Sequence, residues 1–289
     1  MLRLALIGKG ISQSYSPGIH RIGATLSQVA CSYDLLDIGD VSQLGPLIAD
    51  LRLGRWHGFN ITIPFKSEIL TFLDVYDRSA VNTIYVKDGL ICGTSTDGLG
   101  FERGLLQMKV DRSQMQELNF VGCGGAVLSI IEYWQLIKSK DQASLQINIL
   151  SRSENSARAL RVKEYCMTVG IQLRFYCDFE DFRSILPPHA IVVNAMPKSP
   201  ASAPIMSSDQ LLSLPRETVF YDLNYGARSS GIFEGAAAYF PKFTDGLPML
   251  VEQARQSQKI WWGTDLDFED LYEETATWLG VPLHKDSTL

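Results

Sequence analysis

The chain has 289 residues, 46% of them hydrophobic and 20% charged, and a formal net charge of −6. This length and composition favour two globular domains. The negative charge argues against a nucleic-acid surface, and no apolar stretch is long enough for a membrane span. The five scattered cysteines indicate neither a disulfide framework nor a zinc site, so no metal is expected and a reducing, cytoplasmic location fits best.

The N-terminal segment is expected to form a buried strand over Leu2–Ile7 and then a helix that starts near Pro17. Ser16 is the expected N-cap, because serine hydroxyls accept from free amides at a helix start. Ser14 lies two residues earlier, so both hydroxyls can face one side and bind a small anion such as a carboxylate. Plain capping explains Ser16 but not Ser14. His20 is expected to be a packed histidine.

A polar and apolar alternation over Asn60–Phe65 predicts a strand, and a helix is expected over Ser67–Leu73. Open α/β sheets bind ligands where a strand ends and a helix begins. Asn60, Thr62 and Lys66 could therefore point into one polar pocket. The alternative is that Lys66 is an exposed lysine of the first helical turn.

A second polar group follows a predicted hairpin over residues 84–92. Asn82 precedes the hairpin, and Asp97 comes after it, between Thr96 and Gly98. A lysine and an aspartate that meet over a substrate hydroxyl can pass a proton. Asp97 is also a candidate N-cap of a helix over 99–108, and the two roles are compatible.

The sequence changes character near Phe101, and a strand over Leu118–Val121 precedes a glycine loop and an apolar helix over Val127–Ile137. This order is typical of the start of a dinucleotide-binding domain. Small residues let the backbone approach a pyrophosphate at the helix N-terminus; here they are Gly122, Gly124, Gly125 and Ala126. Val127 replaces the third glycine of G-x-G-x-x-G, so the motif alone is weak.

The next strand, over Gln146–Leu150, ends in Ser151, Arg152 and Ser153. An acid at this strand end would bind the ribose of NAD, whereas an arginine with hydroxyls suits the 2′-phosphate of NADP. Glu154 is an unfavourable neighbour for a phosphate and keeps NAD possible. The plain alternative for Arg152 is a solvated loop charge.

Further strands are expected over 173–177, 190–194 and 219–223, which together predict a doubly wound sheet. A loop that starts at Thr244 is expected to lead into a helix that runs to about Trp262, and a last helix is expected over 268–279. Gln253 lies in the first of these helices and faces either the site or solvent.

Taken together, these motifs resemble those of the shikimate dehydrogenase family, which includes the quinate/shikimate dehydrogenases. The resemblance covers nearly the whole chain. It rests on Ser14-Tyr15-Ser16-Pro17, residues 60–66, Ala80-Val81-Asn82-Thr83, Thr96-Asp97-Gly98, the glycine loop 122–126, residues 221–225 and residues 245–253.

The resemblance implies a two-domain α/β enzyme with its active site in the cleft between the domains. A substrate-binding domain would span 1–101 and a Rossmann-like, doubly wound dinucleotide-binding domain 102–242. C-terminal helices over 243–289 would return to the first domain. Such an enzyme is an NADP-dependent oxidoreductase that interconverts 3-dehydroshikimate and shikimate, a step towards chorismate and the aromatic amino acids. The family contains monomers and homodimers.

By the same resemblance, Lys66 and Asp97 would be the catalytic pair, and Ser14 and Ser16 would hold the substrate carboxylate. The other implied substrate contacts are Thr62, Asn82, Asp97, Tyr225 and Gln253. The implied cofactor contacts are Gly122, Gly124, Gly125, Ala126, Ser151, Arg152, Ser153, Asn194, Ala195 and Met196, with Gly246 and Met249 beside the nicotinamide.

Several positions depart from the family pattern, and three of them bear most on the substrate and the cofactor. Tyr15 replaces a frequent lysine, Glu154 falls where NAD-accepting relatives tend to carry an acid, and Pro248 replaces a glycine. These departures keep open a paralogue that acts on quinate or a related ring hydroxy acid with NAD. A catalytically silent ligand-binding relative is a further alternative, against which the retention of Lys66 and Asp97 argues.

Overall fold

The computed structural model describes residues 1–110, 115–141, 144–196, 205–226 and 235–281. The chain forms two units, one of Met1–Gly100 with Leu250–Leu289 and one of Phe101–Met249. The boundaries fall inside helix α3 (Asp97–Gln107) and helix α9 (Leu247–Trp262). Among the described residues, no helix combines the length and hydropathy that crossing a membrane requires.

The first unit is built on a mixed sheet with the strand order β2-β1-β3-β5-β6-β4. Strand β1 pairs in parallel with β2 and β3, whereas β3, β5 and β6 pair antiparallel. The strands are β1 (Leu2–Gly8), β2 (Cys31–Asp37), β3 (Gly58–Ile61), β4 (Val75–Tyr76), β5 (Thr83–Lys87) and β6 (Leu90–Thr94). The predicted hairpin is therefore confirmed as β5–β6.

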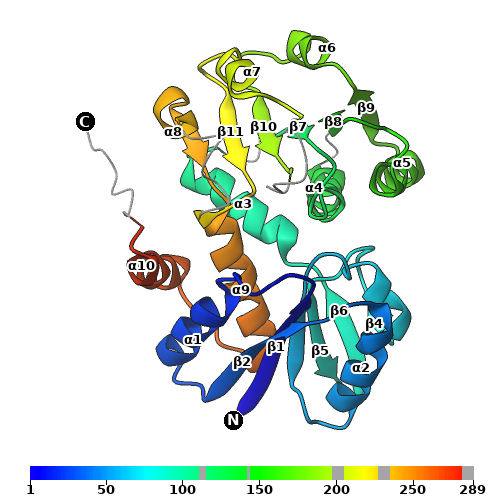
Figure 1. Cartoon of the computed structure of the whole chain (residues 1–289), viewed down its shortest axis with the longest axis vertical. Coiled ribbons are helices and arrows are strands. Elements are labelled where there is room, and N and C mark those ends of the chain that lie inside the picture. Colours follow the sequence, from blue (N-terminus) through cyan, green and yellow to red (C-terminus); the bar gives the residue numbers. More distant parts are fainter. Residues whose placement is uncertain (111–114, 142–143, 197–204, 227–234, 282–289) are drawn as a thin grey trace. The chain divides into compact units, whose positions relative to one another are not determined.

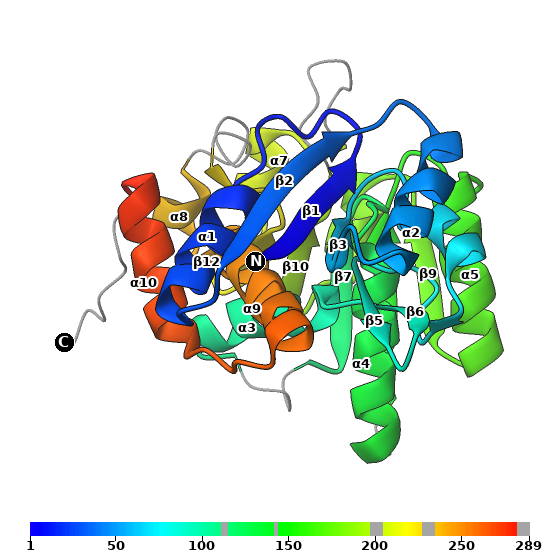
Figure 2. The same cartoon turned by 90° about the horizontal axis from the view of Figure 1, so that it is seen from below.

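Alternation along β3 gives the two faces of this sheet different characters. Phe59 and Ile61 join the apolar core beneath helix α2 (Leu44–Arg52), which follows a short 3₁₀ helix, η1 (Val41–Gln43). Asn60 hydrogen-bonds Ser257 of α9. Helices α1 (Ser16–Leu26), α9 and α10 (Phe268–Leu279) gather beside β1 and β2 (Figure 2).

Gly58 is the point where α9 approaches β3 most closely. A Cβ at this position would lie 2.2 Å from Trp261 Nε1. The same indole nitrogen donates to the Ile84 carbonyl over 2.9 Å. The glycine thus permits the contact that fastens the C-terminal helices to the sheet.

Three local predictions are wrong in detail. Strand β3 ends at Ile61, not Phe65, because the chain turns there and the Phe65 N–H donates to the Thr62 carbonyl. The predicted helix over 67–73 is a 3₁₀ helix, η2 (Glu68–Phe72). Ser16 is the first residue of α1 and not its N-cap; its own N–H donates to Ser14 Oγ, so Ser14 takes up a free amide of the helix start.

The second unit contains a sheet with the order β12-β11-β10-β7-β8-β9, in which neighbouring strands pair in parallel. Its strands are β7 (Glu117–Val121), β8 (Gln146–Leu150), β9 (Gln172–Tyr176), β10 (Ile191–Asn194), β11 (Val219–Asp222) and β12 (Lys242–Thr244). The crossover helices are α4 (Val127–Asp141), α5 (Ala157–Val169), α6 (Phe179–Ser184), α7 (Ser208–Leu212) and α8 (Ala236–Tyr239). The predicted doubly wound sheet is confirmed.

Side chains of this sheet alternate between two apolar cores. Phe120, Val193 and Tyr221 pack with α3, α4 and α5, whereas Val121 and Phe220 pack with α6, α7 and α8. Figure 1 shows these two helix layers on either side of the strands.

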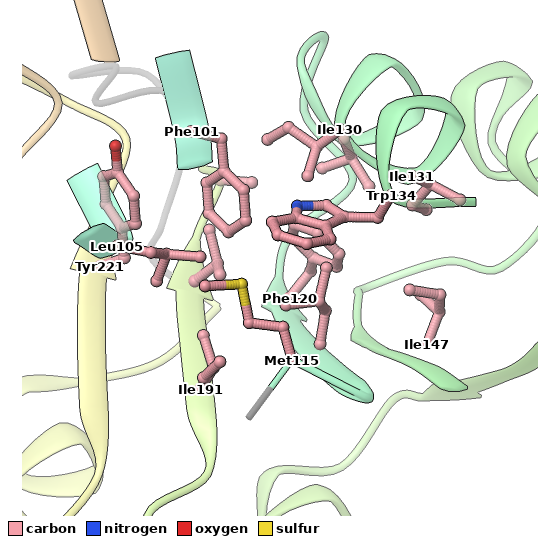
Figure 3. Close-up of a cluster of buried hydrophobic side chains, with 14 of the residues drawn as sticks. Phe101, Leu105, Met115, Phe120, Ile130, Ile131, Trp134, Ile147, Ile191 and Tyr221 are labelled. Atoms are coloured by element: carbon pink, nitrogen blue, oxygen red, sulfur yellow. The ribbon is translucent and has the colours of Figure 1, made fainter. Parts of the chain in front are cut away.

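In the first core, Phe101 lies between two larger rings (Figure 3). It stacks on Tyr221 with a centroid distance of 5.0 Å and meets Trp134 edge-on at 6.4 Å. This packing fixes the part of α3 that belongs to the second unit.

Candidate active site

Lys66 and Asp97 form an ion pair in the first unit. Lys66 Nζ lies 2.6 Å from Asp97 Oδ2 and 2.9 Å from Oδ1. The carboxylate side chain is 1% exposed and the lysine 14% exposed. Lys66 stands in the turn after β3, where its carbonyl accepts from the Val81 N–H, and Asp97 is the first residue of α3. The structure therefore brings the two predicted residues into direct contact.

Asn82 is the third member of this group. Its Nδ2 donates to Asp97 Oδ1 over 2.9 Å and to Thr96 Oγ1 over 3.0 Å. The carboxylate of Asp97 thus accepts from an ammonium and from an amide in a buried setting, where charge-assisted hydrogen bonds are strong. Such an environment holds the carboxylate in one orientation beside the amine.

Ser14 and Ser16 also meet as predicted, with 3.1 Å between their hydroxyl oxygens. Ser16 is buried and Ser14 half-buried at the start of α1. Between them, the Tyr15 ring packs edge-on against Trp278 of α10 at 6.1 Å. The pair offers hydroxyls beside the amides of a helix N-terminus, a combination that suits a carboxylate.

The Asn60 side chain forms its hydrogen bonds with residues other than Lys66. Asn60 Oδ1 accepts from the Tyr33 hydroxyl over 2.7 Å and lies 3.1 Å from His20 Nε2. Burial lowers the pKa of His20 from 6.5 to about 3, against the opposing effect of the Asn60 hydrogen bond. His20 also stacks on Tyr33, so the prediction of a packed histidine is confirmed.

Thr62 and Gln253 are both half-buried in the first unit. A Cβ on Gly8 would lie only 2.4 Å from the γ-methyl of Thr62, so β1 must carry a glycine at this position. The Gln253 carbonyl accepts from Thr96 Oγ1 over 3.3 Å, which joins α9 to the residue before Asp97. The substrate roles of both residues stay predictions.

In the second unit, the glycine loop follows β7 as predicted. A Cβ on Gly124 would lie 2.2 Å from the Ala195 carbonyl oxygen, and Gly122 has a φ of +89° and contacts Met196. No larger residue fits against the loop after β10. The loop leads directly into α4, with residues 123–126 half-buried at the helix start, an arrangement that fits the pyrophosphate of a dinucleotide.

Ser151, at the end of β8, is buried, whereas Arg152, Ser153 and Glu154 are exposed. The Ser151 hydroxyl donates to the Ser153 carbonyl, and the Ser153 N–H donates back to it. Glu154 is bound by Lys163 of α5, with 2.7 Å between Oε2 and Nζ. The acid that disfavours a phosphate thus carries its own counter-charge.

Asn194, a predicted cofactor contact at the end of β10, forms a buried cluster with Asp222 at the end of β11, to which the sequence analysis assigned no role. Asp222 Oδ1 accepts from the side-chain amides of Asn194 and Asn224, each over 2.8 Å. The Asn224 amide also donates to the Met196 carbonyl. Burial raises the pKa of Asp222 from 3.8 to about 6, although these hydrogen bonds oppose the rise. An acid that closes a buried strand was the available signal.

The remaining predicted residues of the second unit lie near this cluster. The Gly246 N–H donates to the Asn224 carbonyl over 2.8 Å, and a Cβ on Gly246 would lie 2.4 Å from the Leu223 carbonyl oxygen. Met249 is buried in the core with Phe101 and Tyr221, and Tyr225 is half-buried after β11. Their ligand roles stay predictions.

The fold and the site define a class of α/β protein. One unit carries a buried lysine–aspartate pair at the end of a strand, and the other is a doubly wound sheet with a dinucleotide-type glycine loop.

Comparisons with known proteins show what this chain is similar to. Residues 6–84 match the model of the shikimate dehydrogenase substrate-binding domain. The chain is 29% identical over 271 residues to the shikimate dehydrogenase (NADP(+)) of Exiguobacterium sp., covering 92% of this chain and 95% of that protein. The structure of shikimate 5-dehydrogenase from Listeria monocytogenes in complex with shikimate and NAD matches with a TM-score of 0.80 and 23% identity, covering 95% of this chain and 96% of that one.

The fold extends to another activity as well. The ligand-free 5-ketofructose reductase of Gluconobacter sp. matches with a TM-score of 0.73 and 21% identity, covering 96% of this chain and 98% of that one. The family model and the similar sequences agree: residues 6–84 match a shikimate dehydrogenase domain, and the chain is similar to shikimate dehydrogenases over nearly its whole length.

Proposed function

We propose that this chain is an NADP-dependent oxidoreductase that interconverts 3-dehydroshikimate and shikimate. The unit of Met1–Gly100 with Leu250–Leu289 would bind the substrate, and the unit of Phe101–Met249 the cofactor. The observation that carries the proposal is the buried Lys66–Asp97 pair with Asn82, which lies in the unit whose first part matches a shikimate dehydrogenase substrate-binding domain.

The chain's own groups would handle the proton of the reaction. In the oxidising direction, the ring hydroxyl loses its proton to the Lys66–Asp97 pair, and in the reducing direction the pair returns it. Asn82 holds the Asp97 carboxylate through its amide, so the pair keeps one geometry. NADP, when bound, supplies the hydride chemistry. General acid–base catalysis of this kind contributes about 10² to 10⁴ in rate.

The substrate carboxylate would be held by the hydroxyls of Ser14 and Ser16, which lie together at the start of α1. Thr62, Asn82, Gln253 and Tyr225 would contact the ring hydroxyls. In this arrangement the negatively charged carboxylate of the substrate lies at a helix N-terminus, and the reacting hydroxyl lies at the ion pair.

NADP is the proposed cofactor, and the relative in Exiguobacterium carries it in its name. The glycine loop and the start of α4 would take the pyrophosphate, and Ser151, Arg152 and Ser153 the 2′-phosphate. The ion pair of Glu154 with Lys163 supports this choice, because it offsets the one acid beside that site.

Absorbance of the reduced nicotinamide tests the proposal directly. The purified chain is mixed with shikimate or quinate and with NADP or NAD in turn. Fast reduction of NADP with shikimate is the expected result. Reduction only with quinate would change the proposed substrate, and reduction only with NAD would change the proposed cofactor. In both cases the proposed hydride and proton transfer would stand.

Quinate or a related ring hydroxy acid, used with NAD, is the second candidate. Tyr15 packs on Trp278 next to the two serines, where relatives frequently carry a lysine. Ligand binding without cofactor reduction for any pair would instead favour a catalytically silent relative.

We also propose a cytoplasmic location, which the five free cysteine thiols support. Whether the chain is a monomer or a homodimer is measurable by light scattering of the purified protein.

A further inference from the structure

A cluster of buried hydroxyls lies directly behind Asn82. Its members are Thr83 of β5, Thr96 before α3 and Ser257 of α9, and we call them the hydroxyl cluster. Thr83 and Ser257 are both 0% exposed. Their hydroxyl oxygens are 2.9 Å apart, although 174 positions separate them in the sequence. Because valine and alanine would fill such positions without any polar group to satisfy, these hydroxyls call for an explanation.

The hydroxyl cluster fixes which way the Asn82 amide points. Asn82 Oδ1 accepts from Thr83 Oγ1 over 2.9 Å, from the Thr96 N–H over 3.0 Å and from Thr96 Oγ1 over 3.2 Å. With the oxygen held by these donors, the amide nitrogen must face Asp97 Oδ1. If the Asn82 amide were flipped, its oxygen would face the Asp97 carboxylate and its NH₂ group would face the Thr96 N–H. Both contacts would be repulsive.

The same hydroxyls connect α9 to the ion pair. Ser257 Oγ donates to the Gln253 carbonyl over 2.9 Å, and Thr96 Oγ1 reaches that carbonyl as well. Asn60 Nδ2 contributes from the sheet, 3.0 Å from Ser257 Oγ and 3.2 Å from Thr83 Oγ1. One cluster therefore contacts two predicted substrate residues, Asn82 through its side chain and Gln253 through its backbone carbonyl.

We propose that Thr83 and Ser257 are positioning residues for the reaction: they hold the Asn82 amide towards Asp97 and hold Gln253 of α9 in register with it. The inference rests on the proposed function and extends it to two residues that do not touch the ion pair themselves. Their effect on turnover passes through Asn82 and not through cofactor binding.

Two substitutions at one position separate positioning from simple packing. Thr83→Val keeps the shape of the side chain and removes the hydroxyl, whereas Thr83→Ser keeps the hydroxyl and removes a methyl group. We expect Thr83→Val to lower kcat for shikimate by about three- to tenfold, the worth of one buried hydrogen bond. Thr83→Ser should keep kcat within about twofold of the parent protein, although the small cavity left by the methyl group lowers its thermal stability.

Cofactor affinity and a matched control complete the kinetic test. NADP dissociation constants, measured by titration calorimetry, should be the same for the parent protein and both variants. Thr275→Val is the control, because Thr275 of α10 is also 0% exposed in the first unit and its hydroxyl has no hydrogen-bond partner in the described part of the chain. Thr275→Val should leave kcat unchanged. Activity that simply follows stability across the four proteins would overturn the proposal.

A measurement without substrate keeps this inference separable from the proposed function. Hydrogen exchange of the Asn82 side-chain amide can be followed by NMR, with Asn82→Asp used to assign the signal. Exchange should be slow in the parent protein and in Thr83→Ser, and at least about tenfold faster in Thr83→Val and Ser257→Ala. Unchanged exchange in Thr83→Val would refute positioning, whatever the substrate. If the parent protein fails to oxidise shikimate but the exchange rates separate as stated, only the proposed function fails.

Discussion

At the scale of single residues, the Lys66–Asp97 pair joins a carboxylate that is 1% exposed to a lysine whose side chain is 14% exposed. Removing one partner of a buried pair leaves the other charge uncompensated, which is costly. In the proposed mechanism, the lysine is the more exposed partner and the one through which a bound hydroxyl exchanges its proton with the pair. Its position is set by the turn after β3, and that of the carboxylate by α3 and Asn82.

Lys66→Ala should lower kcat with shikimate by about 10² to 10⁴, the usual worth of a general acid–base group. NADP affinity should change by less than about twofold, because the cofactor unit is untouched. Steady-state kinetics and a cofactor titration measure the two effects. Lys259→Ala is the control, since Lys259 of α9 forms an exposed ion pair with Asp265 in the segment after that helix. Turnover near that of the parent would remove Lys66 from the mechanism.

The ion pair of Glu154 with Lys163 leads to a separate prediction about the choice of cofactor. Lys163 also lies over the Phe175 ring at 5.1 Å, which holds the ammonium near Glu154. Lys163→Met frees the acid beside the 2′-phosphate site and should weaken NADPH binding relative to NADH by about two- to fivefold, a small factor because the pair is exposed. Fluorescence titration of both cofactors measures this ratio.

The charge origin of this effect is checked by a second change. Glu154→Gln in the Lys163→Met background should restore the ratio, and Lys163→Arg should keep it near that of the parent. A ratio that stays altered in the double variant would attribute the effect to lost packing on Phe175 instead.

At the scale of elements, Asp222 ties the end of β11 to the end of β10 and to the loop that meets Gly246. Its pKa is raised to about 6 in the folded protein, chiefly by burial. At a pH between the pKa that Asp222 has in the unfolded chain and its pKa in the folded protein, the folded state holds a proton that the unfolded state has lost. Stability from this group is therefore present at low pH and is lost as the pH rises towards 6.

Asp222→Asn should remove this dependence, because an amide has no charge to bury and its oxygen can still accept. Compared with the parent, the free energy of unfolding of the variant should gain about 2 kcal/mol between pH 4.5 and 7.5. Urea unfolding at both pH values measures it, and all other titrating groups cancel in the comparison. An equal difference at the two pH values would mean that Asp222 titrates normally.

Elements with strong periodicity or clear end signals were predictable from sequence. Strand β8 and helix α10 have the predicted bounds, and the glycine loop lies where its spacing requires. Short elements such as β12 and η2 were missed or mistyped, because a few residues carry no period and their pairing depends on distant neighbours. The Lys66–Asp97 contact followed from motif order. The hydroxyl cluster did not, since nothing local links Thr83 to a serine 174 positions away.

At the scale of the whole molecule, the two units should respond separately to their ligands. Binding lowers local opening of the backbone, which hydrogen exchange detects. Shikimate alone should slow exchange mainly over 60–66 and 82–97, and NADP alone mainly over 121–127 and 150–156. For each ligand, the segments expected to respond to the other ligand serve as the control. Protection in the opposite pattern would reverse the assignment of the two units.

The first unit is assembled from both ends of the chain, and this sets the order in which a newly made molecule matures. Asn60 lies 197 positions before its partner Ser257. At synthesis rates of roughly 5 to 20 residues per second, β3 leaves the ribosome about 10 to 40 seconds before α9. The second unit is continuous in sequence, so its strands are all available before the first unit has its last helices. The unit that is synthesised first is therefore the one that finishes folding last.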